Sequence, residues 1–515
     1  MKKSSLASIS CLLASLFAFA ACGGGGNEGG GNVTADKYEI TVACQTEESE
    51  KDVLTALADA YMKKHTDTKI NVKTFTGKDF DTYMNGLAQQ IEGSPNIIWT
   101  SDSYHARWDN YFTDLRPFYE KSSETAYDLY YESMLDTAAT NGDFKPTKSY
   151  SASEGDDGKE YGLYFAPRDY NKPVLLCNTN LFSTMDAQYE EYYKEANGGA
   201  MAADYKSTTT MLEDIVAGNN WDDITDLFAF SKLIAERLTY VIQTAESKNI
   251  AGVEVKNTWK DRTVLDLKLS WEPSYVTILN AMGIDDIIND DGTLSLTEQS
   301  TVLENLHSNL YPEGVNNLYY SRADDTNFAQ GITFMKVVSR PVVLGYKKNF
   351  TAMYGSASLQ AIQIPTDAIA AGCSGYAINN YYHDKSVTVN GVTKSYDDIS
   401  WDFIKFIITQ EGQEVAGATG NNIPVLKSLR DSSTAAWRNI EGLEAMDDDA
   451  WVAGDELKQD WFNIYKSVDR INFRTVITGF FTNFAKENYN EGSLAQLISN
   501  TENAYGNHHP TNSIR

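Results

Sequence analysis

Cysteine is scarce in this chain of 515 residues, which contains five of them. Cys11 and Cys22 belong to the N-terminal segment, and the other three, Cys44, Cys177 and Cys373, are an odd number without the spacing of a metal site. Cys44 and Cys177 lie in apolar, strand-like runs, where a free thiol behaves as a small buried hydrophobic residue. The cysteines therefore imply neither a disulfide framework nor a metal centre, and we expect no cofactor.

Basic residues are also few relative to acidic ones. The sequence has 43 Lys and Arg against 71 Asp and Glu, which gives a formal net charge of −28 at pH 7. The acidic residues are scattered along the chain, as on a solvated surface. Such a surface repels nucleic acid and anionic lipid headgroups, so we expect no nucleic-acid partner.

Long hydrophobic runs are confined to the N-terminus. Lys2 and Lys3 precede an apolar run, Ile9–Ala21, which ends in small residues. This order is typical of a secretory signal with its cleavage site. No later stretch reaches the roughly 20 apolar residues that a membrane-spanning helix requires.

Cys22 follows the small pair Ala20-Ala21 and precedes a glycine-rich tract. This arrangement resembles a bacterial lipoprotein box, whose cysteine receives lipids and becomes the mature N-terminus. The resemblance implies a signal peptide at 1–21, lipidation of Cys22, a flexible tether at 22–36, and a protein held by lipid on the extracytoplasmic side of the cell membrane. An ordinary secreted protein with a chance cysteine at the cut is the alternative.

The mature chain has a globular composition, 42% hydrophobic and 12% aromatic, and is long enough for two or three packed units. Its first part alternates predicted strands with helices and argues for an α/β fold with a parallel sheet. In such sheets, ligands lie beyond the carboxyl ends of the strands. The expected elements are strands at 38–44, 70–75 and 96–99 and helices over 53–61 and 80–91, and the polar residues after the strands include Gln45, Glu47 and Asp102.

Several later segments, taken in order, resemble the family 1 extracellular solute-binding proteins, the maltose-binding type that serves ABC importers. Each segment is weak by itself, and their order from about Tyr38 to about Ile498 is the specific part. The segments are Tyr161–Pro167, Leu175–Phe182, Asn220–Ile224, Phe328–Gly331 with Met335, Gly372–Ile378 and Trp401–Phe406.

The resemblance implies a two-lobed periplasmic-binding-protein fold of type II. Each lobe would be a mostly parallel sheet flanked by helices, and a hinge would join the lobes through strands near Val174–Asn178 and Leu359–Ile364. The first lobe would comprise residues 37–173 with a return segment at 359–400. The second would comprise 174–358 with C-terminal helices within 401–515.

The resemblance also implies a set of ligand contacts in the cleft. Trp99 could instead cap a core strand, and Asp102 could cap the next helix. Arg340 and Arg470 could form structural ion pairs. Trp271 favours the cleft, because Leu267 and Leu269 before it already supply the strand core. The implied contacts are Gln45, Glu47, Trp99, Asp102, Arg168, Asp169, Trp271, Glu272, Arg340, Tyr346, Ser374, Arg470 and Asn472.

We therefore expect a monomeric, lipid-anchored receptor that captures a carbohydrate, an oligosaccharide, by hinge closure and delivers it to the transmembrane subunits of an ABC permease. We expect no enzymatic activity, because the sequence has no Gly-x-Ser-x-Gly elbow, no His-Glu-x-x-His and no phosphate-binding glycine loop. The alternatives are a surface carbohydrate-active hydrolase, which would use two carboxylates, and a receptor of the same fold for a polyamine or a peptide.

Overall fold

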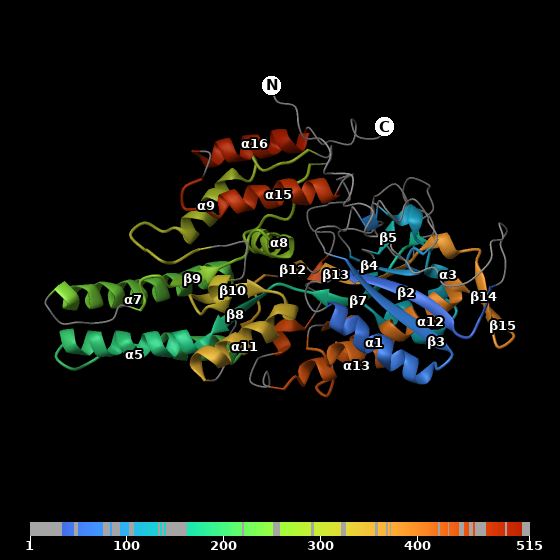
Figure 1. Cartoon of the computed structure of the whole chain (residues 1–515). Helices are drawn as coiled ribbons and strands as arrows, with labels where there is room; N and C mark the ends of the chain where they lie inside the picture. The colour runs from blue at the N-terminus through green and yellow to red at the C-terminus, as the bar shows by residue number, and fades with distance from the viewer. Residues whose placement is uncertain are drawn as a thin grey trace, which may run out of the picture.

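The structure, a computed structural model, has two lobes lying side by side, each built around its own sheet (Figure 1). The buried hydrophobic residues form two clusters, and the first continues from the first lobe into part of the second. It describes residues 33–45, 50–75, 83–84, 93–101, 108–131, 134–135, 138–140, 162–218, 221–250, 258–289, 293–320, 326–355, 359–366, 369–370, 372–420, 423–430, 432–441, 448–452, 457–458, 470–489 and 492–506.

The first lobe contains a six-stranded sheet in the order β16-β7-β13-β4-β2-β3. Apolar residues at helical spacing bury one face of α1, including Val53, Leu54, Leu57 and Tyr61. The elements are β2 (Tyr38–Gln45), α1 (Glu50–Lys64), β3 (Thr68–Phe75), β4 (Ile97–Ser101), β7 (Ala166–Asn171), β13 (Gly372–Ile378), α12 (Tyr396–Ile408), α13 (Gln410–Gly417), β16 (Ile423–Pro424) and α14 (Lys427–Arg430).

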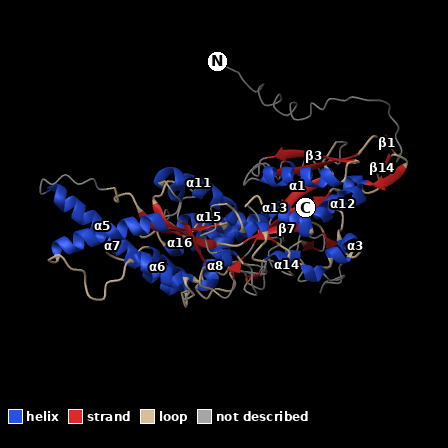
Figure 2. Ribbon diagram, turned by 90° about the horizontal axis from the view of Figure 1, so that it is seen from below, coloured by secondary structure: helices blue, strands red, loops and turns tan. Residues whose placement is uncertain are grey.

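Short elements complete this lobe at its periphery. The chain enters it through β1, which pairs in parallel with β14 at the end of the lobe away from the second lobe (Figure 2). The peripheral elements are β1 (Val33–Ala35), α3 (Arg116–Tyr119), β5 (Ala139–Thr140), β6 (Gly162–Leu163), β14 (Ser386–Val389) and β15 (Val392–Ser395).

The second lobe contains a four-stranded sheet in the order β11-β8-β10-β9. Helices α5 and α7 pack together and extend away from this sheet (Figures 1 and 2). The elements are β8 (Val174–Asn178), α5 (Thr179–Ala196), α6 (Thr208–Val216), α7 (Ile224–Ile250), β9 (Thr263–Asp266), α8 (Glu272–Ala281), α9 (Ser300–Leu310), α10 (Thr326–Ala329), β10 (Thr333–Val338), α11 (Val343–Tyr354), β11 (Leu359–Ile362), α15 (Arg470–Phe484) and α16 (Leu494–Gly506).

The periodicity of residues 38–101 predicted the local elements well. Strands β2, β3 and β4 and helix α1 all lie where they were expected, and the three strands are parallel. The helix expected over 80–91 lies largely outside the described residues. The prediction that each sheet is mostly parallel is wrong: three of the five pairings in the first sheet and two of the three in the second are antiparallel.

The antiparallel pairings arise where the chain passes between the lobes. Strand β7 ends at Asn171 and β8 begins at Val174, so only Lys172 and Pro173 separate a strand of one sheet from a strand of the other. The return runs from β11 in the second sheet to β13 in the first. The two passages run in opposite directions, so the strands that they join lie antiparallel: β7 beside β13, and β8 beside β11.

The expected division of the C-terminal part needs correction. Helices α12 and α13 and strand β16 belong to the first lobe, and buried residues as far as Trp451 join its core. Only α15 and α16 pack into the core of the second lobe. The 401–515 segment is therefore shared, because the strongly apolar face of α12 covers the first sheet before the chain crosses again.

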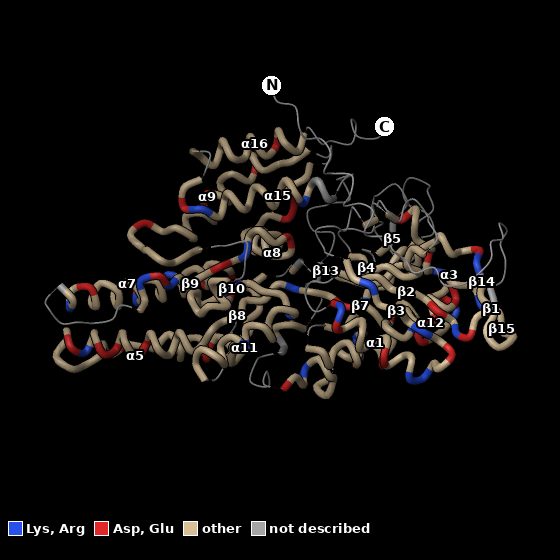
Figure 3. Tube along the Cα trace, in the orientation of Figure 1, with Lys and Arg blue, Asp and Glu red and all other residues tan. Residues whose placement is uncertain are grey.

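Charge is distributed as the sequence predicted. Asp and Glu are spread over both lobes without forming a block (Figure 3). None of the helices in the described part of the chain is long and apolar enough to cross a membrane.

Candidate functional site

The strand register shows which sheet edges face each other. Asn171 at the end of β7 pairs with Gly372, and Ser374 pairs with both Asp169 and Ser101, so these ends share one edge of the first sheet. Because Lys172 and Pro173 alone lead from this edge to β8, it faces the second lobe. Parallel strands β2 and β4 also end at this edge. In such sheets, ligands bind beyond the carboxyl ends of the strands, so this edge is the expected place for a ligand.

The facing edge of the second sheet follows from its own pairings. Val174 pairs with Val338 and Ile362 pairs with Leu175, which places the start of β8 and the ends of β10 and β11 at that edge. The end of β9 lies there as well, because Asp266 pairs with Lys336. The chain from Leu267 to α8 continues from this edge.

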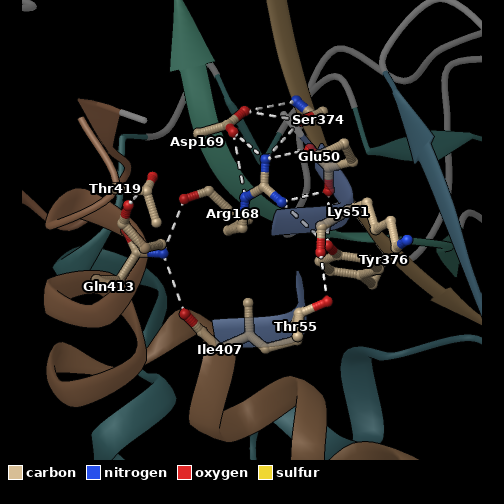
Figure 4. A network of polar contacts seen from close by, with 11 residues as sticks. Glu50, Lys51, Thr55, Arg168, Asp169, Ser374, Tyr376, Ile407, Gln413 and Thr419 are labelled. Atoms are coloured by element: carbon tan, nitrogen blue, oxygen red, sulfur yellow. Dashed lines mark hydrogen bonds and ion pairs between the residues drawn. The ribbon is translucent and has the colours of Figure 1, made fainter. Parts of the chain in front are cut away.

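A buried ionic cluster occupies the edge of the first sheet (Figure 4). The Arg168 guanidinium, 2% exposed, donates from Nη1 to Glu50 Oε1 at 2.5 Å and from Nη2 to Glu50 Oε2 at 2.8 Å. Its Nε donates to Asp169 Oδ2 at 3.1 Å, and Nη2 also forms an ion pair with that oxygen. Glu50 accepts a further bond from the Tyr376 hydroxyl at 2.7 Å. One cation is thus shared by two carboxylates.

Burial governs the ionisation of this cluster. Burial raises the pKa of Asp169. The positive charge of Arg168 opposes this increase, and the negative charge of Glu50 adds to it. Burial likewise raises the pKa of the Tyr376 hydroxyl well above its usual value. For Arg168, burial favours the neutral form, but Asp169 and Glu50 outweigh it and hold the pKa well above the ordinary value. The guanidinium therefore stays charged and binds carboxylates of the protein itself.

Ser374 lies at the outer side of this cluster and is only half-buried. Asp169 Oδ1 accepts bonds from the Ser374 hydroxyl at 2.8 Å and from its backbone N–H at 3.3 Å. On the other side, the Gln413 side-chain amide donates to the Arg168 carbonyl at 2.8 Å (Figure 4). The predicted residues Arg168, Asp169 and Ser374 are therefore brought together, and half-buried Gln45 ends β2 at the same edge.

A second buried ion pair lies at the edge of the other sheet. Lys336 Nζ of β10 contacts Asp266 Oδ2 of β9, and both residues are almost fully buried. Asp266 Oδ1 also accepts the backbone N–H of Lys268 at 2.8 Å. Lys268 has a φ of 48°, in the left-handed region that costs a non-glycine residue about 1 kcal/mol or more. The bond to Asp266 holds this turn, which leads directly to Trp271.

Trp271 and Glu272 lie where this turn enters α8. Trp271 is the half-buried N-cap residue, and the Lys268 ammonium lies 5.3 Å from its ring centroid. Glu272 is buried, and its Oε2 lies 3.4 Å from Arg474 Nε of α15. The structure thus places both predicted residues beside the facing edge, with Trp271 the more accessible of the two.

Three other predicted contacts are interior residues in this structure. Trp99 lies in the middle of β4 and packs near Phe75 with 5% exposure. The Arg340 guanidinium lies 5.9 Å from the Trp437 ring centroid and 5.7 Å from that of Trp451, and it donates to the Trp437 carbonyl at 3.0 Å.

Tyr346 of α11 packs edge-on against Phe328 in the first core. The resemblance implied that Trp99 contacts the ligand, but β4 extends to Ser101, beyond the expected strand end at Trp99, and Trp99 is buried within it.

The remaining predicted residues lie where the structure gives no side-chain description. Glu47, Asp102 and Cys22 are outside the described residues. Arg470 and Asn472 belong to the first turn of α15, but their side chains are not described.

Sequence reasoning missed Glu50, Tyr376, Asp266 and Lys336, all of which are buried at the facing edges. Glu50 was hidden because an acidic residue in the first turn of a helix is favoured by the helix dipole alone. Lys336 interrupts the apolar run of β10, and this was the one available signal that a buried carboxylate had to lie nearby.

Comparison with known proteins defines the class of this fold. No family model and no curated protein matches the sequence. Among solved structures, the GacH receptor of Streptomyces glaucescens, determined unliganded and with acarbose, matches with a TM-score of 0.57 and 13% identity over 92% of this chain and 98% of that one.

Two further solved structures match to a similar degree. The cyclic α-maltosyl-1,6-maltose binding protein of Arthrobacter globiformis gives a TM-score of 0.56 and 14% identity over 91% of this chain and 98% of that one. The maltose-binding protein MalE of Listeria monocytogenes, bound to maltose, gives a TM-score of 0.55 and 15% identity over 93% of this chain and 100% of that one. The chain thus has the α/β periplasmic-binding-protein fold of maltose-binding-type solute-binding proteins over more than 90% of its length, as the sequence motifs predicted.

Proposed function

We propose that this protein is the solute-binding receptor of an ABC importer, and that it captures an oligosaccharide between its lobes and delivers it to the permease subunits. The observation that carries this proposal is the pair of facing sheet edges. Half-buried Gln45 and Ser374 lie at one, and half-buried Trp271 lies beside the other. Hydroxyl, amide and aromatic groups on opposite sides suit a sugar, which presents hydroxyls and apolar C–H faces.

The fold supports a receptor that binds by closure. Two separate sheets joined by short links allow one lobe to rotate against the other, and a ligand that touches both edges favours the closed state by its extra contacts there. The solved relatives are receptors and binding proteins, three of which bind acarbose, cyclic α-maltosyl-1,6-maltose or maltose.

The carboxylates at the first edge do not favour a hydrolase. Glu50 and Asp169 share Arg168 and are buried, at 6% and 3% exposure. A general acid and a nucleophile or base must reach the scissile bond. Within the described residues, this pair therefore suits structural support of a binding site better than hydrolysis.

Replacing Trp271 with alanine tests the site. We expect maltose affinity, measured by isothermal titration calorimetry, to fall by about 2 kcal/mol or roughly 30-fold, as for a buried aromatic anchor. Trp221→Ala is the matched control, because Trp221 packs against Phe230 in the second core. It is expected to lower the melting temperature and leave affinity unchanged.

Three results would count against a sugar receptor. Equal affinity losses in both variants would mean that Trp271 is structural. Release of reducing sugar from maltose would identify a hydrolase. Stabilisation by spermidine but by neither maltose nor ribitol would identify a receptor for a cationic ligand.

We further propose that lipid at Cys22 holds the receptor on the extracytoplasmic face of the membrane. Ten glycine-rich residues separate Cys22 from β1, and such a tether raises the receptor's local concentration at its permease. Cys22→Ser is expected to move the protein from the membrane fraction to the soluble fraction, with mass spectrometry of the N-terminus as the direct check. Release of the unaltered protein in soluble form would contradict the anchor.

A further inference from the structure

Glu50 joins three segments that are distant in the sequence. It is the first residue of α1, and its carboxylate accepts bonds from Arg168 of β7 and from Tyr376 of β13 (Figure 4). Its two oxygens are bound separately, Oε2 by Arg168 Nη2 and Oε1 by both Arg168 Nη1 and Tyr376. Arg168 is thereby held in one orientation.

This orientation decides what Asp169 can bind. Asp169 Oδ2 is engaged by Arg168, whereas Oδ1 accepts the hydroxyl and N–H of Ser374. The two oxygens thus serve different partners. Arg168 reaches only Oδ2, from Nε and Nη2, because Glu50 engages Nη1 and also accepts a bond from Nη2.

We propose that Glu50 is a positioning residue of the ligand site: by dividing the donors of Arg168, it keeps Asp169 bound to Ser374 and so fixes the edge that faces the second lobe. The inference rests on the proposed function in one respect, namely that Ser374 contacts the ligand. Glu50 itself does not touch the ligand and acts through Arg168.

The consequence of removing the charge of Glu50 follows from geometry. In Glu50→Gln, the amide keeps one acceptor oxygen, but its NH₂ group faces the N–H groups of Arg168. Nε and Nη2 of Arg168, which both bind Oδ2 in the unaltered protein, can then each bind a different Asp169 oxygen, the bidentate arrangement that guanidinium and carboxylate prefer. Ser374 loses its acceptor, and the first edge loosens at β13.

A matched control exists in the second lobe. Asp186 of α5 is as buried as Glu50 and accepts bonds from the N–H and hydroxyl groups of Thr208 and Thr209. It lies within α5, and the threonines that it binds are the first two residues of α6. Asp186→Asn therefore costs stability by the same mechanism without affecting Arg168.

The first experiment needs no ligand. Hydrogen–deuterium exchange of β13, residues 372–376, is compared with that of β8 in each variant. Glu50→Gln is expected to accelerate exchange of β13 at least tenfold relative to β8, whereas Asp186→Asn leaves the ratio unchanged. An unchanged ratio in Glu50→Gln would overturn the proposal, whatever the ligand.

The second experiment is a double-mutant cycle on maltose affinity. Glu50→Gln alone is expected to weaken binding about tenfold, and the same change in a Ser374→Ala background to weaken it less than threefold, because the bond through which Glu50 acts is already gone. Additive losses would refute the positioning role. Failure of the unaltered protein to bind maltose would instead count against the proposed function, and the exchange result would stand.

Discussion

Replacing Arg168 with methionine is expected to lower the free energy of unfolding by about 3–5 kcal/mol at pH 7, measured by urea denaturation followed by circular dichroism. Methionine fills much of the same volume but leaves Glu50 and Asp169 facing each other without a cation. Both carboxylates are buried, so water cannot replace the guanidinium. An unpaired buried charge costs far more than a surface ion pair contributes.

The loss is expected to shrink as the pH falls. Burial already raises the pKa of Asp169, and Arg168 is the group that opposes this shift. Without Arg168, the folded-state pKa rises further above the unfolded value of about 3.9. The folded protein then binds more protons than the unfolded chain between those two values, so stability rises as the pH falls through the folded-state pKa.

Arg262→Met provides the control for this pH effect. Arg262 is half-buried, donates to the Thr258 carbonyl at 3.4 Å and lies beside the Trp259 ring. Its loss is expected to cost about 1 kcal/mol or less at every pH, since its partners do not titrate. If the two variants show the same pH dependence, the carboxylates of the cluster are not the source of the effect.

The sequence predicted those parts of the structure that depend on local spacing. Strands β2, β3 and β4 and helix α1 follow from periodicity over fewer than 70 residues, and their parallel order follows from the short connections. The direction of the other strands could not be predicted in this way. Strands β7 and β8 follow each other along the chain but belong to different sheets. The strands that pair with them, β13 and β11, come from residues about 200 positions later.

The candidate site shows the same limit. The resemblance implied Arg168, Asp169 and Ser374 as ligand contacts in the cleft, and the structure brings the three together. Both carboxylates that bind Arg168, however, belong to the protein itself. Glu50 precedes Arg168 by 118 residues, and no local pattern links them. A buried cation was detectable in the sequence only as a charge within an apolar strand; its partners required the fold.

Replacing Lys336 with methionine is the corresponding test in the second lobe. We expect a loss of about 3–5 kcal/mol, because Asp266 remains buried without its ammonium partner. Adding Asp266→Asn removes the unpaired buried charge. The free energy of unfolding of the double variant is expected to lie within about 1 kcal/mol of that of the unaltered protein. Equal losses in the single and double variants would show that Lys336 contributes through packing instead.

The same pair of variants separates stability from binding. Asp266 also accepts the N–H of Lys268, which holds the left-handed turn before Trp271. The amide introduced by Asp266→Asn still offers an oxygen to that N–H, so the turn is retained in the double variant. In the single variant, the Asp266 carboxylate has lost its ammonium partner, so it either rotates toward another hydrogen-bond donor or becomes protonated. Either change disturbs the turn. Maltose affinity should therefore fall in Lys336→Met and recover in the double variant, and an affinity that stays low in both would mean that the turn needs the full charge of Asp266.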